Sequence, residues 1–170
     1  SGGEKARLVM AIMVFDGGHP DFNFELLTAE DCVIVTPPDH PLLAKGDASF
    51  EDIADFPVLL PEAYQSIREV LEAEYRKRGL QSKSVVQMRE VSNISTVIGM
   101  VAAGMGITFA PRTLISREQR SSIGVVRPKG FRLERCYGIV TARNRPSSPV
   151  VRSFARFVRS SIPPGRRGWA

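Results

Sequence analysis

The sequence lacks any run of about 18 apolar residues, so no segment is long and apolar enough for an ordinary membrane-spanning helix. Its N-terminus also lacks the order of basic, apolar and small residues that marks a secretory signal peptide, and we therefore expect a cytoplasmic protein. The 170 residues are 43% hydrophobic and 24% charged, which excludes a disordered chain and suits one domain or two small lobes with a buried core.

Cysteine and histidine are scarce. The two cysteines, Cys32 and Cys136, each lie in an apolar run, which favours buried free thiols over a disulfide between them. No CxxC pair and no cluster of His, Cys, Asp and Glu has metal-site spacing, so we expect no metal and no other cofactor. His19 and His40 both lie in turns; a catalytic triad around Asp39-His40 is conceivable, but a structural turn histidine is the favoured interpretation.

The motifs of common catalytic sites are also missing. The sequence contains no HExxH, no GxSxG and no phosphate-binding loop that ends in Gly-Lys-Ser or Gly-Lys-Thr. Gly99, Gly104 and Gly106 suggest a nucleotide-binding loop, but they close a helix and enter a strand, which is the reverse of the order such a loop needs. We interpret these glycines as a helix end with tight helix-to-strand packing, and we expect no enzyme.

Charge is distributed unevenly along the chain, whose formal net charge is +5. Residues 1–111 carry 9 basic and 16 acidic side chains, whereas residues 112–170 carry 14 basic and 2 acidic ones. A basic pole of this kind can approach phosphates or an acidic partner surface. The favoured alternative is a solvated basic face followed by an arginine-rich tail.

Apolar runs and helical spacing alternate along the chain. Strands are expected at 8–15, 22–26, 32–36, 58–60, 84–88, 107–110, 123–126 and 136–141. Helices are expected at 49–54, at 66–78, after Ser92, at 113–117 and at 149–160, the last with Val150, Val151, Phe154, Phe157 and Val158 inward. This alternation predicts an α/β fold with largely parallel sheets.

Two helix starts are candidates for ligand binding. Residues 49–52 and 66–69 both have the capping-box pattern, and Ser92 is a plausible N-cap. The polar stretches 62–68 and 92–96 place hydroxyl and amide groups where unpaired backbone N–H groups favour an anion such as a carboxylate. Plain helix capping is the alternative, which spacing alone favours.

Two longer segments carry a family resemblance. Residues 27–57 run from a strand through a turn with His40-Pro41-Leu42 and a short helix to Phe56-Pro57. Residues 92–111 run from Ser92-Asn93 through Val101-Ala-Ala-Gly-Met-Gly-Ile107 to Ala110-Pro111. In this order and spacing they resemble the effector-binding domain of LysR-type transcriptional regulators. The resemblance is clear over 8–114 and looser over 115–161.

The resemblance implies an α/β fold of two Rossmann-like lobes of the periplasmic-binding-protein type II kind, joined by two crossover strands, with an inducer in the cleft between them. The first lobe is expected at 1–45 and 112–162, the second at 46–111, and a flexible tail at 163–170. The strand, helix, strand and helix that open the family's first lobe have no counterpart here, so we expect this lobe to be incomplete.

The resemblance also implies where a ligand is held and what the partners are. The implied ligand contacts come from helix starts and crossover residues: Thr36, Pro37, Gln65, Ser66, Arg68, Asn93, Ser95 and Thr96. The expected partners are a small, anionic effector and a second copy of the chain. DNA is expected only through a winged helix-turn-helix that this chain lacks, and no membrane contact is expected.

Two other classes of protein stay open. A solute-binding protein of a transporter shares the architecture, although the missing secretory signal and the cysteines disfavour it. An enzyme on the same scaffold, such as a dehydratase or a phosphoribosyltransferase, is least favoured because histidines and a phosphate loop are lacking.

Overall fold

The computed structural model describes residues 10–14, 20–80, 85–88, 91–143 and 148–162. Expectations for His19, for residues 8, 9, 15 and 84 and for the tail at 163–170 lie outside these residues. By contacts the chain divides into two compact units. We call residues 31–134 the central unit, and residues 1–30 with 135–170 the terminal unit.

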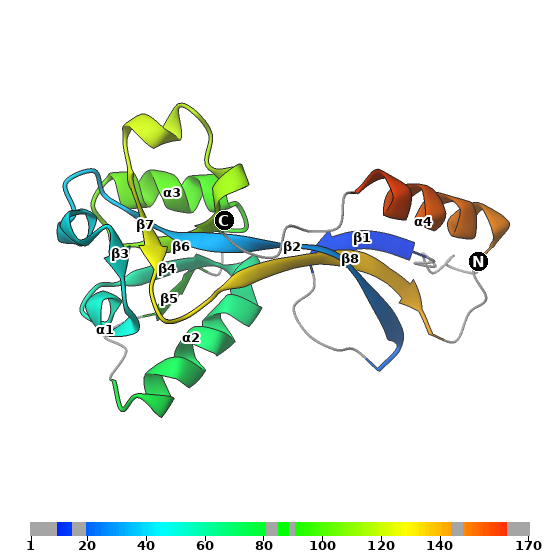
Figure 1. Cartoon of the computed structure of the whole chain (residues 1–170), viewed down its shortest axis with the longest axis horizontal. Helices are drawn as coiled ribbons and strands as arrows, with labels where there is room; N and C mark the ends of the chain where they lie inside the picture. Colours follow the sequence, from blue (N-terminus) through cyan, green and yellow to red (C-terminus); the bar gives the residue numbers. More distant parts are fainter. Residues whose placement is uncertain (1–9, 15–19, 81–84, 89–90, 144–147, 163–170) are drawn as a thin grey trace, which may run out of the picture. The chain divides into compact units, whose positions relative to one another are not determined.

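The elements alternate as an α/β fold requires, which confirms the expected class (Figure 1). Short 3-10 turns lie between them at η1 (Pro41–Lys45), η2 (Glu62–Tyr64), η3 (Arg112–Leu114) and η4 (Gln119–Ser121). The strands and helices follow in the order β1 (Met10–Val14), β2 (Phe22–Thr36), β3 (Asp47–Ala48), α1 (Phe50–Ile53), β4 (Val58–Pro61), α2 (Gln65–Lys77), β5 (Val85–Met88), α3 (Ile94–Ala102), β6 (Thr108–Pro111), β7 (Gly124–Pro128), β8 (Glu134–Ala142) and α4 (Pro149–Ser161).

In the terminal unit, strands β1, β8 and β2 lie side by side in that order. β1 and β8 are antiparallel, with Ile12 opposite Ile139. Helix α4 buries Ala155 and Val158 in a small core with Ile139. Sheet and helix therefore share one apolar layer in this unit.

Helix α4 corrects one prediction. Its inward face holds Ala155 and Val158, whereas Val150, Phe154 and Phe157 are 77%, 45% and 64% exposed. The apolar residues of α4 cover a wider arc than its contact with the sheet, so the helical pattern alone did not show which of them are buried.

In the central unit, β6, β2, β7 and β3 are neighbours in that order, and β4 and β5 form a separate two-stranded sheet. β4 pairs with β5 in parallel, with Pro61 opposite Met88, and a parallel bridge joins Val58 to Ile107 just before β6. β2 is antiparallel to both β6 and β7, while β3 is parallel to β7. The sheet is therefore mixed rather than largely parallel.

The two crossovers of this unit run in opposite directions along the sheet. The chain passes from β4 through α2 to β5 at the sheet's edge, then back through α3 to β6 on the other side of β4. Because parallel crossovers are right-handed, reversing the direction places the second helix on the opposite face. Figure 1 shows α2 and α3 on opposite sides of these strands.

Aromatic rings fill the core beneath α1 and α2. Phe50 is fully buried and contacts the rings of Tyr75 and Phe131 edge to face, at centroid distances of 4.8 and 4.7 Å. The guanidinium of Arg78 lies 5.4 Å from the Phe50 ring centre. Burial raises the pKa of Tyr75 to about 12, so this phenol stays neutral as a core residue should.

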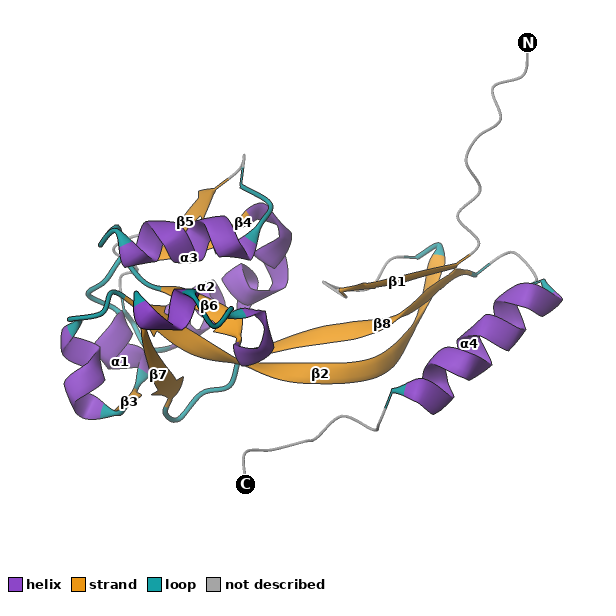
Figure 2. Cartoon of the chain, turned by 90° about the horizontal axis from the view of Figure 1, so that it is seen from above, coloured by secondary structure: helices purple, strands orange, loops and turns teal. Residues whose placement is uncertain are grey.

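Several sequence predictions differ from the structure in detail. The expected strands at 22–26 and 32–36 form one uninterrupted strand, β2, which Figure 2 shows as a single ribbon. The helical turn expected at 113–117 is replaced by η3 and η4. The two units divide within β2 between Glu30 and Asp31 and within β8 between Glu134 and Arg135. These units are not the expected lobes, whose bounds at 45 and 111 stay a prediction.

Candidate functional site

The carboxyl ends of β4 and β5 form a topological switch point. The two strands are neighbours, but the chain leaves them toward helices on opposite faces of the sheet. In open α/β sheets, such a reversal leaves a crevice between the two connections, where ligands bind. The connections here lie next to each other, because the backbone N–H of Glu62 donates to the carbonyl of Val91 at 3.2 Å.

The start of α2 differs from the prediction. The helix begins at Gln65, directly after η2, and no side chain caps its first turn. Ser66 is therefore the second helical residue, and the capping box expected at 66–69 does not form. The first turn of α2 also contains no acidic residue. The positive end of the helix dipole is thus not offset by a carboxylate within that turn.

The start of α3 is capped by Asn93 rather than by the expected Ser92. The Asn93 side chain accepts a hydrogen bond from the backbone N–H of Ser95 at 2.8 Å. Ser95 and Thr96 are exposed in a first turn that again holds no acidic residue. No sequence pattern pointed to Gln119, whose side-chain amide donates to the carbonyl of Ser95 at 3.3 Å.

Two of the expected ligand contacts on α2 already have partners on their own helix. The Arg68 guanidinium donates to the carboxylate of Glu72 at 2.7 Å, with 34% of the Arg68 side chain exposed. The Gln65 amide donates to Glu69 at 3.1 Å. A ligand that used either side chain would have to replace these bonds.

Thr36 and Pro37 are not brought together with the helix starts. Antiparallel pairing puts Cys32 opposite Pro111 and Val35 opposite Thr108, while β6 runs parallel to β4. Thr36 therefore lies at the amino end of β4, and the helix starts follow its carboxyl end. Thr36 is also fully buried, and its hydroxyl donates to the carbonyl of Pro37 at 3.0 Å.

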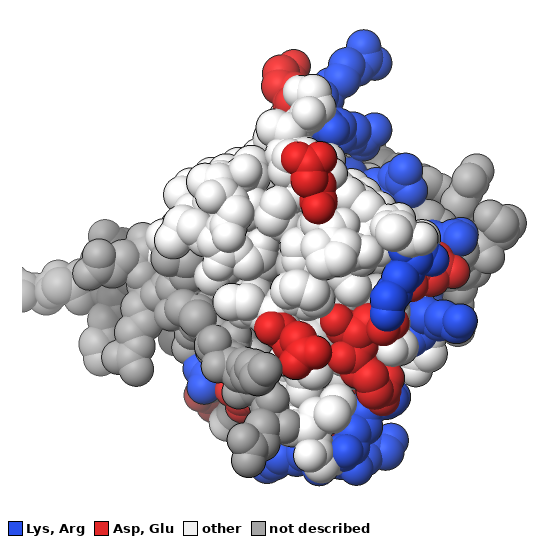
Figure 3. All heavy atoms as spheres, turned by 90° about the vertical axis from the view of Figure 1, so that its left-hand side faces the viewer, with Lys and Arg blue, Asp and Glu red and all other residues white. Residues whose placement is uncertain are grey.

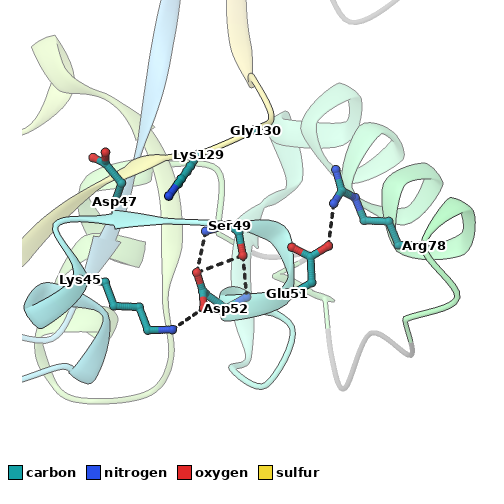
Figure 4. A pocket seen from close by; sticks show the side chains of 8 residues that line it. All are labelled: Lys45, Asp47, Ser49, Glu51, Asp52, Arg78, Lys129 and Gly130. Atoms are coloured by element: carbon teal, nitrogen blue, oxygen red, sulfur yellow. Dashed lines mark hydrogen bonds and ion pairs between the residues drawn. The ribbon is translucent and has the colours of Figure 1, made fainter.

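A hollow of about 580 Å³ in the central unit is lined by charged side chains and was not predicted from the sequence. Figure 4 shows its lining residues, among them Lys45, Asp52, Glu51, Arg78 and Lys129. Lys45 pairs with Asp52, and Arg78 donates to Glu51 at 2.6 Å. Among the described residues, no carboxylate forms an ion pair with Lys129.

The capping box at the start of α1, which lines this hollow, confirms the sequence prediction for residues 49–52. The Asp52 carboxylate accepts from the Ser49 backbone N–H at 2.8 Å, and the Ser49 hydroxyl accepts from the Asp52 N–H at 3.3 Å. Hydrogen bonds lower the pKa of Asp52 to about 2. The largest effect comes from the Lys45 ammonium and the next from the Ser49 backbone N–H. The network is therefore ionised at neutral pH and locks η1 to α1.

Several basic residues of the last third of the chain form ion pairs with acidic residues from earlier in the chain. Within the central unit, Arg132 donates to Asp31 at 2.5 Å and Arg127 donates to Asp47 at 2.9 Å. Figure 3 shows acidic and basic side chains next to each other around an uncharged area on one face. The described residues thus favour a solvated, paired surface over a purely basic pole.

The remaining candidates have structural explanations. His40 caps η1 by accepting from the N–H of Leu42 at 3.3 Å and packs on Phe56, which confirms the turn histidine. Burial lowers the pKa of His40. Neither cysteine is in a disulfide; Cys32 is buried as expected, whereas Cys136 is only half-buried. Within the described residues, no group of His, Cys, Asp and Glu could hold a metal ion, and no helix is long and apolar enough to cross a membrane.

The family model described as LysR substrate binding domain matches residues 6–163, and the chain belongs to this family. An uncharacterized HTH-type transcriptional regulator, YybE of Bacillus subtilis (strain 168), is 27% identical over 79% of this chain. The chain spans 44% of that protein, which is less than half its length.

Solved regulatory domains share the fold. The CcmR regulatory domain of Synechocystis PCC6803, in complex with 2-PG, has a TM-score of 0.73 and 18% identity, over 91% of this chain and 74% of its own. The effector binding domain of QuiR, in complex with shikimate, has a TM-score of 0.72 and 22% identity, over 90% of this chain and 71% of its own. The periplasmic-binding-protein type II fold is thereby confirmed.

Proposed function

We propose that this chain is the effector-binding part of a LysR-type regulator and that a small anionic metabolite binds at the carboxyl ends of β4 and β5. The observation that carries the proposal is the switch point, where two helix starts without acidic residues follow neighbouring parallel strands. Oriented N–H groups at helix starts favour a carboxylate or phosphate group. Its contacts come from Gln65, Ser66, Asn93, Ser95 and Thr96, with Arg68 once it leaves Glu72.

The comparisons support this ligand class. CcmR and QuiR were each solved with a small molecule, 2-PG and shikimate, and shikimate is a carboxylate. The relatives are transcriptional regulators, so they give no support to a solute-binding protein of a transporter. In the cytoplasm, effector binding to the full-length protein would shift a conformational equilibrium. A second copy of the protein and a DNA-binding domain would respond to that shift.

The test combines a ligand panel with charge substitutions at the helix starts. Shikimate, 2-PG and other small carboxylates are titrated into the chain by calorimetry. Ser66→Asp and Thr96→Glu should each weaken a bound carboxylate about tenfold or more, because charge repulsion replaces attraction. The same substitutions should stabilise the fold by about 0.3–1 kcal/mol, since acidic residues suit a helix start.

Ala73→Glu is the matched control, because it adds the same charge to an exposed position in the middle of α2. It should leave the affinity unchanged. If a carboxylate binds both helix-start variants with the same affinity as the wild type, the proposed site is contradicted. Failure of the whole panel to bind the full-length regulator would contradict the proposed function.

A further inference from the structure

A third connection begins at the strand ends where the effector is proposed to bind. Strand β6 runs parallel to β4, because Val58 and Ile107 form a parallel bridge and the N–H of Leu59 donates to the Ile107 carbonyl at 2.8 Å. The carboxyl end of β6 therefore lies on the same side as the carboxyl ends of β4 and β5. The chain continues from there into residues 112–121, which we call the η3–η4 segment.

Hydrogen bonds fix the η3–η4 segment against the start of α3. The Gln119 side chain accepts from the Ser116 N–H at 3.0 Å, and the Ser116 hydroxyl accepts from the Gln119 N–H at 3.2 Å. The same Gln119 side chain donates to the Ser95 carbonyl at 3.3 Å, and Ile115 anchors the segment in the core. The segment therefore lies next to the first turn of α3, where Figure 1 shows it as a yellow-green ribbon.

The segment carries an excess of positive charge. Its charged residues are all exposed: Arg112, Arg117, Glu118 and Arg120. In the described part of the chain, no carboxylate forms an ion pair with any of these three arginines. The guanidinium of Arg120 donates to a backbone carbonyl, that of Arg112, at 3.5 Å. Three arginines and one glutamate leave the segment with an excess of two positive charges.

Two of these arginines lie close to the proposed contacts. Arg117 is two residues before Gln119, so their Cα atoms are at most about 7 Å apart, and Gln119 contacts Ser95. Arg112 comes directly after Pro111, the last residue of β6. The long side chains of Arg112 and Arg117 can therefore reach a ligand that lies at the helix starts.

A carboxylate in the first connection offsets part of this charge. Glu62 is exposed at the beginning of the connection from β4 to α2, whereas residues 91–93, before α3, carry no charge. Together with the η3–η4 segment, these stretches hold three arginines and two glutamates. The starts of α2 and α3 each add the equivalent of about half a positive charge. The region is therefore positive enough to favour a second negative group on a ligand that already carries one.

We propose that the η3–η4 segment forms a basic wall of the effector site and selects an effector with two acidic groups. This inference rests on the proposed function, because it concerns the same site. The N–H groups at the helix starts hold one acidic group. The guanidinium groups of Arg112 and Arg117 hold the other, since a guanidinium binds a carboxylate through two parallel hydrogen bonds.

Succinate and succinamate are the probes, because they have nearly the same shape and differ by one negative charge. Both are titrated into the full chain by calorimetry at neutral pH and constant ionic strength. Succinate should bind about tenfold more tightly, since only its second carboxylate can form charge-assisted bonds with the arginines. Equal affinities, a preference for succinamate, or no saturable binding of succinate would each overturn the inference.

Substitutions assign the preference to the segment. Arg112→Gln combined with Arg117→Gln should weaken succinate about tenfold and leave succinamate unchanged. The matched control is Arg76→Gln combined with Lys77→Gln, which removes two positive charges from exposed positions at the far end of α2 and should change neither affinity. Circular dichroism checks that both variants keep the fold.

The double variants also separate this inference from the proposed function. Equal losses of succinate binding in both double variants, or an equal loss of succinamate and succinate in the arginine variant, would overturn the inference. If shikimate binds at the helix starts and succinate has no advantage over succinamate, the inference fails while the proposed function stands. Failure of every carboxylate to bind the full-length regulator would contradict both.

Discussion

Substitution of three glycines, within α3 and after it, should change the stability of the central unit to different extents. Gly99 lies inside the helix, Gly104 follows the helix end with a φ of 84°, and Gly106 has a φ of 148°. A Cβ at Gly99 or Gly104 would meet nothing within 4 Å. A Cβ at Gly106 would collide with the carbonyl oxygen of Pro57 and lie 3.2 Å from its carbonyl carbon.

The collision falls on the link between β4 and β6. The backbone N–H of Ile107 donates to the Pro57 carbonyl at 2.8 Å, and the N–H of Leu59 donates to the Ile107 carbonyl at 2.8 Å. Gly106→Ala combines an unfavourable φ, which costs about 1–3 kcal/mol, with a strained backbone bond worth about 1 kcal/mol. We expect a loss of about 2–4 kcal/mol in the free energy of unfolding.

The same substitution at the other two glycines serves as a control, because neither involves a collision. Gly104→Ala has only the conformational cost and should lose about 1–2 kcal/mol. Gly99→Ala should gain about 0.5–1 kcal/mol, because alanine favours a helix interior over glycine. Urea unfolding followed by circular dichroism measures all three. A Gly106→Ala protein as stable as Gly104→Ala would refute the close approach of β6 to Pro57.

Three further predictions concern the charged network and the thiols. Ser49→Ala removes the cap of α1 and should cost about 1 kcal/mol in unfolding free energy, measured by urea titration. Because the pKa of Asp52 falls from 3.8 to about 2 in the folded state, its contribution is complete above pH 4 and is lost as pH decreases toward 2. The stability difference between wild type and Asp52→Asn should therefore shrink from pH 6 to pH 3, and a constant difference would contradict the ion pair with Lys45. Cys32, which is 2% exposed, should react with a thiol reagent far more slowly than the half-buried Cys136; equal rates would contradict the burial.

The strands of this fold could be predicted because apolar runs bounded by proline and glycine leave few alternatives. The buried face of α4 could not. The spacing of Val150, Phe154 and Phe157 marks an apolar arc on α4, but the extent of the arc that a sheet covers depends on its neighbours, and these three residues are exposed. Capping boxes were expected from the Ser-x-x-acid patterns at 49–52 and 66–69. Only the first forms one, because α2 begins at Gln65 and Ser66 is its second residue rather than its N-cap.

The sequence predicted the helix starts of the candidate site but not the position of the expected crossover residues, Thr36 and Pro37. Polar residues that follow two strands predicted the edge at Ser66 and Ser95. Thr36 has a suitable side chain, but its position depends on the register of β2 against β6, which no local pattern determines. The ion pair between Glu25 and Arg159 joins residues that are 134 positions apart in the sequence. Contacts of that range arise from the fold as a whole.

The central claim is that the helix starts at the switch point hold the effector. Backbone amide resonances followed by NMR during titration of the carboxylate that the panel identifies test it most directly. The largest shifts should fall on the N–H groups of Gln65, Ser66 and Thr96, with Thr36 unaffected. Saturable binding that leaves those three amides unmoved would contradict the account.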